Sequence, residues 1–263
     1  MNSVRDDFFD AAGLKDELAS ALRVRGIALN AEPQVDLASG RLVGAEMLIG
    51  WNRVERLAPE PAQFGPLVQE RGLLFPIGAW MLREAVAATA EIRLIRPSFR
   101  MWINVSAEEL RDRAWLQAVL GYGNALRGVG IEITERVAMH DLEHTLRTLN
   151  VLRPAGLSVT LDDFGAGHCS PESLKRLRVD VVKLDRDLVA ALPHGRRERD
   201  IVSATLCMAR GLGFDVVAEG IETPEQLRTL RDEGCRYGQG SYLERPVAIA
   251  ELRRAIRDGA LVS

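Results

Sequence analysis

The chain lacks the sequence features of several protein classes. Its 263 residues include only three cysteines, Cys169, Cys207 and Cys235, and no CxxC pair. An odd number of widely spaced cysteines favours neither a disulfide framework nor a zinc site, so a reducing compartment is the simplest expectation. No apolar run reaches the roughly 18 residues of a membrane span, and the first residues contain no apolar signal-peptide core. We therefore expect a cytoplasmic protein that does not enter a membrane.

The chain also has no excess of basic over acidic residues. The chain has 34 Lys and Arg against 37 Asp and Glu, a formal net charge of −3, which argues against binding to a nucleic-acid polymer. Neither GxxxxGK[ST] nor GxSxG occurs, which excludes the P-loop and the serine-hydrolase motifs. With 47% hydrophobic and 27% charged residues, the composition is that of a globular protein long enough to bury a large core.

Short apolar segments alternate with longer amphipathic ones along most of the chain. We predict strands over Leu42–Trp51, Arg100–Val105, Val129–Ile133, Leu157–Leu161, Val179–Leu184, Phe214–Ala218 and, more weakly, Tyr237–Leu243. Helical spacing predicts helices over Pro76–Arg93, Asp141–Arg153, Glu198–Arg210 and Thr223–Glu233. Thr223 and Gln226 have the spacing of a capping box, and Pro224 suits the first helical position. Strands that are apolar throughout are typical of parallel strands, and seven or eight such units favour a (β/α)8 barrel.

The domain organisation follows from the same pattern. Residues 1–26 are expected to form an N-terminal helical lead-in, and residues 27–263 are expected to form the barrel domain. The polar stretch Pro193–Asp200 is the most loop-like insertion. Within it, the mixed charges of Arg196–Arg199 indicate the start of a solvated helix.

Polar side chains fall at or near the carboxyl ends of nearly all the predicted strands. They are Glu46, Asn104, Glu132, Asp162, Asp163, Lys183, Glu219 and Gln239. In a (β/α)8 barrel these ends converge on the face that carries the chemistry. Clustered carboxylates repel one another unless a cation lies among them, and such oxygens suit Mg²⁺ or Mn²⁺. Two such ions can activate a water for attack at phosphorus, with Lys183 binding the water or a phosphate oxygen. The alternative for any single acid is a solvated loop residue or a helix cap.

Two histidines, His140 and His144, lie four residues apart on a predicted helix. This spacing can bind zinc, but Glu143 has the wrong offset for the zinc-protease motif. The dipeptide His140-Asp141 resembles the His-Asp pair of the HD-type phosphodiesterases. The other histidines that those enzymes require are missing from this chain. We interpret the pair as part of a solvated helix face.

The strand-end residues lie in segments that together resemble one known family, the EAL domain of cyclic-di-GMP phosphodiesterases. The matching segments are Val35–Leu48, Ile103–Ser106, Ile131–Glu135, Asp162–Gly167, Val182–Asp185, Ala218–Thr223 and Gln239–Gly240. They run in order over nearly the whole chain. The resemblance implies a (β/α)8 TIM-like barrel whose first strand is antiparallel to the rest. It also implies hydrolysis of one phosphodiester bond of cyclic di-GMP to give linear pGpG, with two Mg²⁺ or Mn²⁺ ions per site.

The resemblance also assigns roles to residues of this chain. One metal would be held by Glu46, Asn104, Glu132 and Asp162, and a second by Asp162, Asp163 and Glu219. The residues that it implies for catalysis are Glu46, Lys183, Glu219 and Glu222, with Lys183 contacting the attacking water. Those implied for the substrate are Leu48, Asp185, Gln239 and Pro246. Glu135 would brace the loop after Asp163, which in the family also forms a homodimer contact.

This chain departs from the family pattern on the substrate side of the site. Gly50 replaces an arginine that grips a substrate phosphate, a loss of roughly 1.5–3 kcal/mol or about 10–100-fold in affinity. Arg53, three residues on, is a candidate to compensate. Glu32 stands where glutamine is usual and would face a dianionic ligand. Met47 and Ser241 replace the usual alanine and aromatic residue.

The loop after Asp163 also differs from the family pattern, with His168, Pro171 and Glu172 where Tyr, Leu and Ser are commoner. Pro171 suits the first position of the following helix. Three interpretations follow from these departures. The favoured one is an active cyclic-di-GMP phosphodiesterase, because every metal-holding position is filled. The alternatives are a non-catalytic receptor for cyclic di-GMP that signals to a protein partner, and a partner-binding regulator that no longer recognises the nucleotide.

Overall fold

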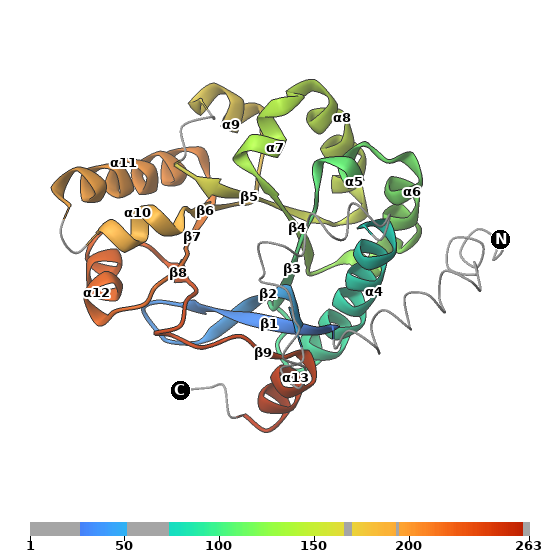
Figure 1. Ribbon diagram of the computed structural model, residues 1–263, viewed down its shortest axis with the longest axis horizontal. Coiled ribbons are helices and arrows are strands. Elements are labelled where there is room, and N and C mark those ends of the chain that lie inside the picture. The colour runs from blue at the N-terminus through green and yellow to red at the C-terminus, as the bar shows by residue number, and fades with distance from the viewer. Residues whose placement is uncertain (1–26, 52–73, 166–169, 193–194, 260–263) are drawn as a thin grey trace.

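Strands β1 to β8 curve around a common axis and close into a barrel surrounded by helices (Figure 1). The computed structural model describes residues 27–51, 74–165, 170–192 and 195–259. The strands are β1 (Ile27–Asp36), β2 (Leu42–Trp51), β3 (Arg100–Asn104), β4 (Val129–Thr134), β5 (Ser158–Phe164), β6 (Val181–Leu184), β7 (Asp215–Ala218), β8 (Tyr237–Gly238) and β9 (Val247–Ala248). The predicted (β/α)8 TIM-like fold is confirmed.

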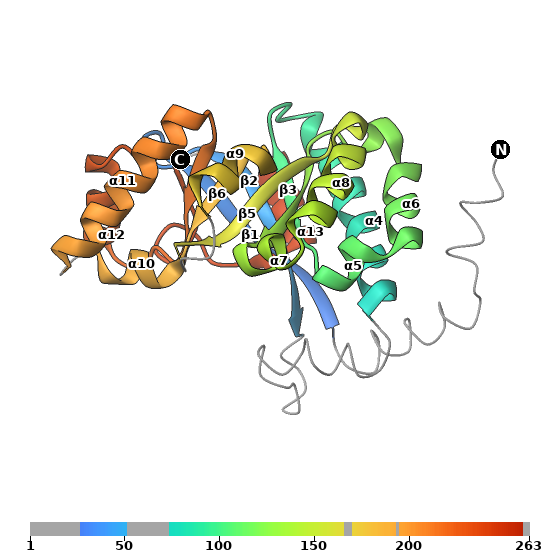
Figure 2. The same ribbon diagram turned by 90° about the horizontal axis from the view of Figure 1, so that it is seen from above.

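Helices of different lengths follow the strands and cover the outside of the barrel. They are α4 (Leu74–Arg93), α5 (Ala107–Arg111), α6 (Arg113–Gly121), α7 (Glu135–His140), α8 (Leu142–Leu152), α9 (Pro171–Leu177), α10 (Arg186–Ala191), α11 (Arg196–Leu212), α12 (Pro224–Asp232) and α13 (Ile249–Arg257). Two short 3₁₀ helices are η1 (Gly123–Leu126) and η2 (Arg153–Ala155). Helices α11 and α12 lie on the opposite side of the barrel from α4 and α6 (Figure 2). None of the helices in these described ranges is long and apolar enough to cross a membrane.

The first strand runs against the others, as the sequence resemblance implies. β1 pairs antiparallel with β2 on one side and with β8 on the other, and the pairs from β2 to β8 are all parallel. The apolar-run criterion did not find β1 because it contains Asn30, Glu32 and Gln34 at alternate positions. Alternate residues of a strand share one face. This face of β1 is therefore polar.

Helix starts follow the capping pattern in the sequence. Thr223 and Gln226 form the predicted capping box of α12 with Pro224 in its first turn, and Pro171 opens α9 behind its cap. α11 begins at Arg196, which confirms the helix start predicted over Arg196–Arg199 and shortens the loop predicted over Pro193–Asp200. The lead-in over residues 1–26, Arg53 and His168 lie outside the described residues.

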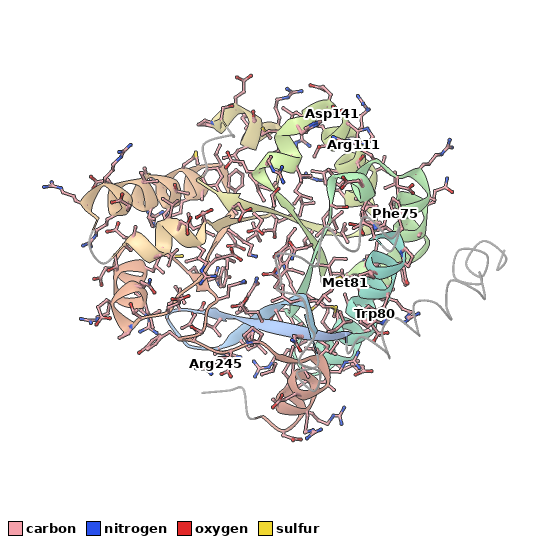
Figure 3. All side chains as sticks on the ribbon, viewed as in Figure 1. Phe75, Trp80, Met81, Arg111, Asp141 and Arg245 are labelled. Atoms are coloured by element: carbon pink, nitrogen blue, oxygen red, sulfur yellow. The ribbon has the colours of Figure 1, made fainter. Side chains whose placement is uncertain are left out.

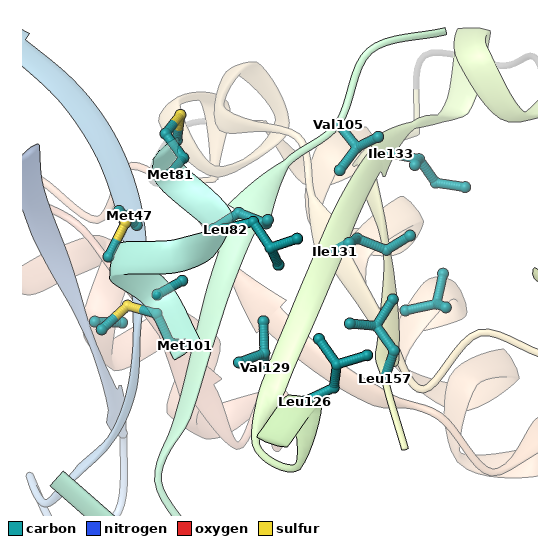
Figure 4. Packing of buried hydrophobic residues seen from close by; sticks show 14 of the residues in the cluster. Met47, Met81, Leu82, Met101, Val105, Leu126, Val129, Ile131, Ile133 and Leu157 are labelled. Atoms are coloured by element: carbon teal, nitrogen blue, oxygen red, sulfur yellow. The ribbon is translucent and has the colours of Figure 1, made fainter. Parts of the chain in front are cut away.

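The main core lies between the barrel strands and the helices around them. Figure 4 shows Leu82 of α4 beside Met101 of β3, with Ile131 and Leu157 from the next strands and loops nearby. Each of these side chains is buried. Burial of an aliphatic side chain of this size contributes roughly 1.5–3 kcal/mol to folding. The core therefore holds the strands in position by their outer faces, while their inner faces point into the barrel.

A small apolar cluster lies inside the barrel, on the amino-terminal side of the polar strand-end residues. Trp102 forms a small buried cluster with Val181 and Val217, and Tyr237 packs against it. Two residues further along their strands, Asn104, Lys183 and Glu219 replace these apolar residues. Because side chains two apart share a face, the carboxyl end of the barrel interior receives the polar groups.

Candidate active site

Carboxylates from four different strand ends surround the ammonium group of Lys183. In the described part of the chain, Lys183 Nζ lies 2.8 Å from Glu46 Oε2, 2.8 Å from Glu132 Oε2 and 3.6 Å from Asp162 Oδ1, and it also contacts Glu219 Oε1. Lys183 has no exposed surface. The side chains come from β2, β4, β5, β6 and the end of β7, so the closed barrel itself brings them together. These five predicted site residues form what we call the Lys183 cluster.

The Lys183 cluster brings four carboxyl groups together around a single ammonium group. One ammonium cannot neutralise four carboxylates, and burial weakens the screening of their repulsion. Burial and the nearby Glu46 raise the pKa of Glu132 well above its ordinary value. Burial likewise raises the pKa of Glu219 to about 8. Burial opposes the charged form of Lys183, but the surrounding carboxylates outweigh it and raise the pKa of this ammonium well above its usual value.

Two amide side chains, Gln239 and Asn104, hold the carboxylate of Glu46 in place. Gln239 Nε2 donates to Glu46 Oε2 at 2.9 Å and to Glu219 Oε1 at 3.0 Å. Asn104 Nδ2 donates to Glu46 Oε1 at 2.7 Å. Burial raises the pKa of Glu46, but Lys183, Gln239 and Asn104 together outweigh burial and hold it below its ordinary value. Glu46 is thus kept ionised with both oxygens engaged.

The donor set fits divalent cations. Carboxylate oxygens of Asp162, Asp163 and Glu219 lie within 4.8 Å of one another. Glu132 Oε1 is buried and has no hydrogen-bond partner among the described residues, a lone acceptor of the kind that a cation would satisfy. Asp163 adopts a left-handed backbone conformation with φ of 55°, and its N–H donates to Asp162 Oδ1 at 2.9 Å. All these donors are hard oxygens, which suit Mg²⁺ or Mn²⁺.

The remaining predicted site residues lie around the Lys183 cluster. Glu222 pairs with Arg186 at 2.8 Å, and both side chains are more than half exposed. Asp185 caps α10 and accepts a hydrogen bond from the backbone of Asp187 at 2.6 Å. Pro246 is exposed just before β9, and Glu135 is buried at the start of α7. Glu222 is thus tied to the charged side chain of Arg186 on α10.

A groove of about 680 Å³ opens beside Asn104. Its walls come from the end of β2, the start of α4, α5 and the start of α7, and they include Leu48. Figure 3 labels Met81 of α4 and Arg111 of α5, which lie on two of these walls. Arg136, at the first turn of α7, also lines the groove. The sequence patterns singled out Leu48 but neither arginine.

Two polar residues of β1 extend the site. Glu32 is directly opposite Glu46 in the β1–β2 pairing, and its Oε2 lies 3.4 Å from Gln239 Nε2. Burial, followed by Glu46, raises the pKa of Glu32. Gln34 Nε2 donates to Gln239 Oε1 at 2.7 Å. Gln34 was missed by the sequence reasoning, although polar residues at every second position of Ile27–Asp36 are the signal that finds it.

The two histidines contact α5 through different atoms. His140 Nδ1 lies 2.8 Å from Arg111 Nη2, and His144 Nε2 lies 3.2 Å from the carbonyl oxygen of Leu110. His140 is exposed and His144 is half-buried. The pair thus joins α7 and α8 to α5.

A barrel of this kind, with acidic side chains gathered at the carboxyl ends of its strands, belongs to the TIM-like (β/α)8 class. A family model described as the EAL domain matches residues 15–246. The chain therefore belongs to the EAL domain family.

Relatives and solved structures agree with this assignment. The chain is 33% identical over 250 residues to the cyclic di-GMP phosphodiesterase NbdA of Pseudomonas aeruginosa, covering 93% of this chain and 32% of that protein. It is 32% identical over 251 residues to the bifunctional diguanylate cyclase/cyclic di-GMP phosphodiesterase MucR of the same organism, covering 92% and 36%. The chain thus spans about a third of the length of these relatives. A structure of the PaMucR phosphodiesterase in complex with c-di-GMP is 32% identical, with a TM-score of 0.80, over 91% of this chain and 99% of that one.

Proposed function

We propose that this chain is a metal-dependent phosphodiesterase that hydrolyses cyclic di-GMP to linear pGpG. The observation that carries the proposal is the excess of buried carboxylates over the single ammonium of Lys183. The names of NbdA and MucR and the c-di-GMP complex of the PaMucR phosphodiesterase support the substrate. The same activity is what the sequence resemblance implies.

The proposed metal ligands fall into two overlapping groups. Glu46, Asn104, Glu132 and Asp162 would hold one Mg²⁺ or Mn²⁺ ion, and Asp162, Asp163 and Glu219 would hold the other. When bound, such ions activate a water and stabilise the charge that develops on the phosphoryl oxygens. The proximity of Asp162, Asp163 and Glu219 and the lone acceptor on Glu132 support these assignments.

Lys183 has two tasks in the proposed reaction. Its ammonium donates hydrogen bonds to the carboxylates around it, which keeps their oxygens turned inward. During hydrolysis it would also donate to the oxygen of the attacking water. That oxygen bonds to phosphorus while the bond from phosphorus to the ribose 3′ oxygen breaks. The water loses one proton to the site, and the leaving 3′ oxygen gains one.

The substrate would lie across the carboxyl end of the barrel. Leu48 borders the groove beside Asn104, and Asp185, Gln239 and Pro246 would contact the ligand on the other sides. We propose that Glu222 assists next to Glu219 and that Glu135 braces the loop after Asp163. The homodimer and the cytoplasmic location expected from the sequence stay predictions.

The first test is a product analysis. The protein is incubated with cyclic di-GMP and Mg²⁺, then with Mn²⁺, and the products are separated by chromatography over time. We expect pGpG that disappears when the metal is chelated, and we expect none from the Glu46→Gln variant. Intact substrate under both metals would contradict the proposal. A binding titration would then separate a receptor for cyclic di-GMP from a regulator that does not bind it.

A further inference from the structure

Gln34 lies behind Gln239 in the barrel interior, on the side away from the carboxylates. We infer that Gln34 is a positioning residue that fixes the amide orientation of Gln239 and, through it, the carboxylates of Glu46 and Glu219. The inference rests on the proposed function only where it concerns metal binding. The orientation of the amide itself is independent of any activity.

The two glutamines are buried, and Gln34 also lines a cavity of about 260 Å³ at the amino-terminal side of the barrel interior. Gln34 is 3% exposed and Gln239 is 2% exposed. Gln34 Nε2 donates to Gln239 Oε1 at 2.7 Å, and Gln239 Nε2 donates to Glu46 Oε2 at 2.9 Å and to Glu219 Oε1 at 3.0 Å. A buried amide needs hydrogen-bond partners, and these three hydrogen bonds supply them within the protein. The four side chains thus form one continuous chain of hydrogen bonds.

The donor and acceptor roles along these hydrogen bonds follow from the chemistry of the groups. An ionised carboxylate only accepts hydrogen bonds, so Gln239 must turn its NH₂ group toward Glu46. Its carbonyl oxygen then points the opposite way, where it needs a donor. Gln34 supplies that donor, and a side chain that only accepts could not. The orientation of one amide therefore selects the orientation of the other.

The local backbone leaves room for this arrangement. Gln34 is paired with Gly44 of β2, next to a register shift after Gln34. A Cβ atom at position 44 would lie 3.3 Å from Gln34 Oε1 and 2.7 Å from the carbonyl oxygen of Arg100. A side chain at position 44 would therefore crowd the amide of Gln34. The absence of a side chain at Gly44 therefore leaves space for the side chain of Gln34.

Loss of the donor on Gln34 would free Gln239 to rotate its amide. Rotation by half a turn would place its carbonyl oxygen against Glu46 and Glu219, where oxygen faces oxygen. The carboxylates would move apart, and they are proposed ligands of both metals. Side chains that orient metal ligands typically change metal affinity or activity by 10–100-fold when they are mutated. We expect the lower end of this range, about 10-fold, because Gln34 acts through Gln239.

The test combines two variants with two readouts on the whole chain. In Gln34→Met the donor is lost at similar volume, and in Gln34→Glu the amide donor is replaced by a carboxyl group, which only accepts hydrogen bonds when it is ionised. The first readout is the NMR signal of the Gln239 side-chain amide in ¹⁵N-labelled, metal-free protein, assigned by its loss in Gln239→Met. The second is the affinity for Mn²⁺ by calorimetry without substrate. We expect the amide signal to shift in both Gln34 variants, and Mn²⁺ to bind about 10-fold more weakly in Gln34→Met and more weakly still in Gln34→Glu.

A double variant separates positioning from general destabilisation. If Gln34 acts through Gln239, adding Gln34→Met to Gln239→Met weakens Mn²⁺ binding no further. Thr148→Val on α8 is the matched control, because it also removes a buried polar group and should leave Mn²⁺ affinity unchanged. An unchanged Gln239 amide signal, or an equal loss of Mn²⁺ affinity in both backgrounds, would overturn the inference. A lack of cyclic-di-GMP hydrolysis in the wild type would refute the proposed function but not the shift of the amide signal.

Discussion

The indole of Trp102 packs against Gly130, its pairing partner on the neighbouring strand β4. A Cβ atom at position 130 would lie 2.0 Å from two ring atoms of this tryptophan. The absence of a side chain on Gly130 of β4 thus leaves room for this large ring in the barrel interior. Trp102 also belongs to the small apolar cluster with Val181 and Val217, which lies nearer the amino-terminal end of the barrel than Lys183 and Glu219.

The first prediction concerns this contact. Gly130→Ala should push Trp102 out of its position, and overpacking of a core typically costs about 1–3 kcal/mol. We expect a lower free energy of unfolding in urea and a changed tryptophan fluorescence. Gly121→Ala, at a position where a Cβ would meet nothing within 4 Å, is the control. Equal stability of the two variants would show that the ring moves aside freely.

The second prediction concerns the charge of the Lys183 cluster. Lys183→Met removes the only ammonium that contacts Glu46, Glu132, Asp162 and Glu219 within the described ranges. Breaking a buried ion pair by removing one partner costs about 3–5 kcal/mol. We expect a strongly lowered Tm in metal-free buffer and no hydrolysis of cyclic di-GMP.

The measurement for Lys183→Met is thermal unfolding with and without Mn²⁺. Added Mn²⁺ should raise the Tm of Lys183→Met more than that of the wild type, because the uncompensated carboxylates then bind the ion more tightly. Lys175→Met, on the exposed side of α9, should behave as the wild type. A smaller shift in Lys183→Met than in the wild type would contradict a cation site among these carboxylates.

The third prediction concerns Glu32, which lies opposite Glu46 on the antiparallel strand. A carboxylate there repels an anionic substrate, so Glu32→Gln should lower the KM for cyclic di-GMP with little change in kcat. Removal of a repulsion of about 1 kcal/mol corresponds to about a fivefold lower KM. Steady-state kinetics check this, with Glu251→Gln on α13 as the control. A higher KM for Glu32→Gln would mean that the carboxylate helps to bind the substrate.

The fourth prediction concerns pH and the turn between β1 and β2. Asp36 Oδ1 accepts from the backbone N–H groups of Ser39 at 2.9 Å and Ala38 at 3.1 Å. The hydrogen bonds, led by that from the Ser39 backbone, lower the pKa of Asp36 against the opposing effect of burial. A lowered pKa in the folded state gives stability that is present above the unfolded value of about 3.9 and lost as the pH falls through the folded value.

Asp36→Ala is the variant that tests this pH dependence. It should therefore be less stable than the wild type near neutral pH, and the difference should shrink below about pH 3.9. Urea unfolding at several pH values measures it. The same series on Asp258→Ala, an exposed residue at the end of α13, controls for general acid effects. A difference that grows as the pH falls would rule out this role for Asp36.

Much of the fold could be predicted from the sequence. Apolar runs located β2 to β7 within a few residues, because parallel strands buried on both faces read as continuous apolar segments. β1 escaped this criterion because its inward face carries Glu32 and Gln34, which hydrogen-bond Gln239 or lie close to it.

The sequence predicted which residues form the site, but not which of their side chains contact one another. The carboxylates of the Lys183 cluster could be predicted from their positions at strand ends, because a barrel brings the ends of its strands together. The contact of one lysine with four acids depends on side-chain reach across the barrel, which no local pattern encodes. The ion pair between Glu222 and Arg186 and the support of Gln239 by Gln34 are similar long-range relationships.

The reversed direction of β1 places its first residue at the carboxyl end of the barrel. Ile27, where β1 begins, is paired with Trp51, where β2 ends, so β1 starts at the same rim of the barrel as the acidic cluster. A slip of β1 by one residue along β2 would turn every side chain to the opposite face of the sheet. Glu32 and Gln34 would then leave the interior together. A change in the β1–β2 register would therefore remove the hydrogen bonds that Glu32 and Gln34 make with Gln239.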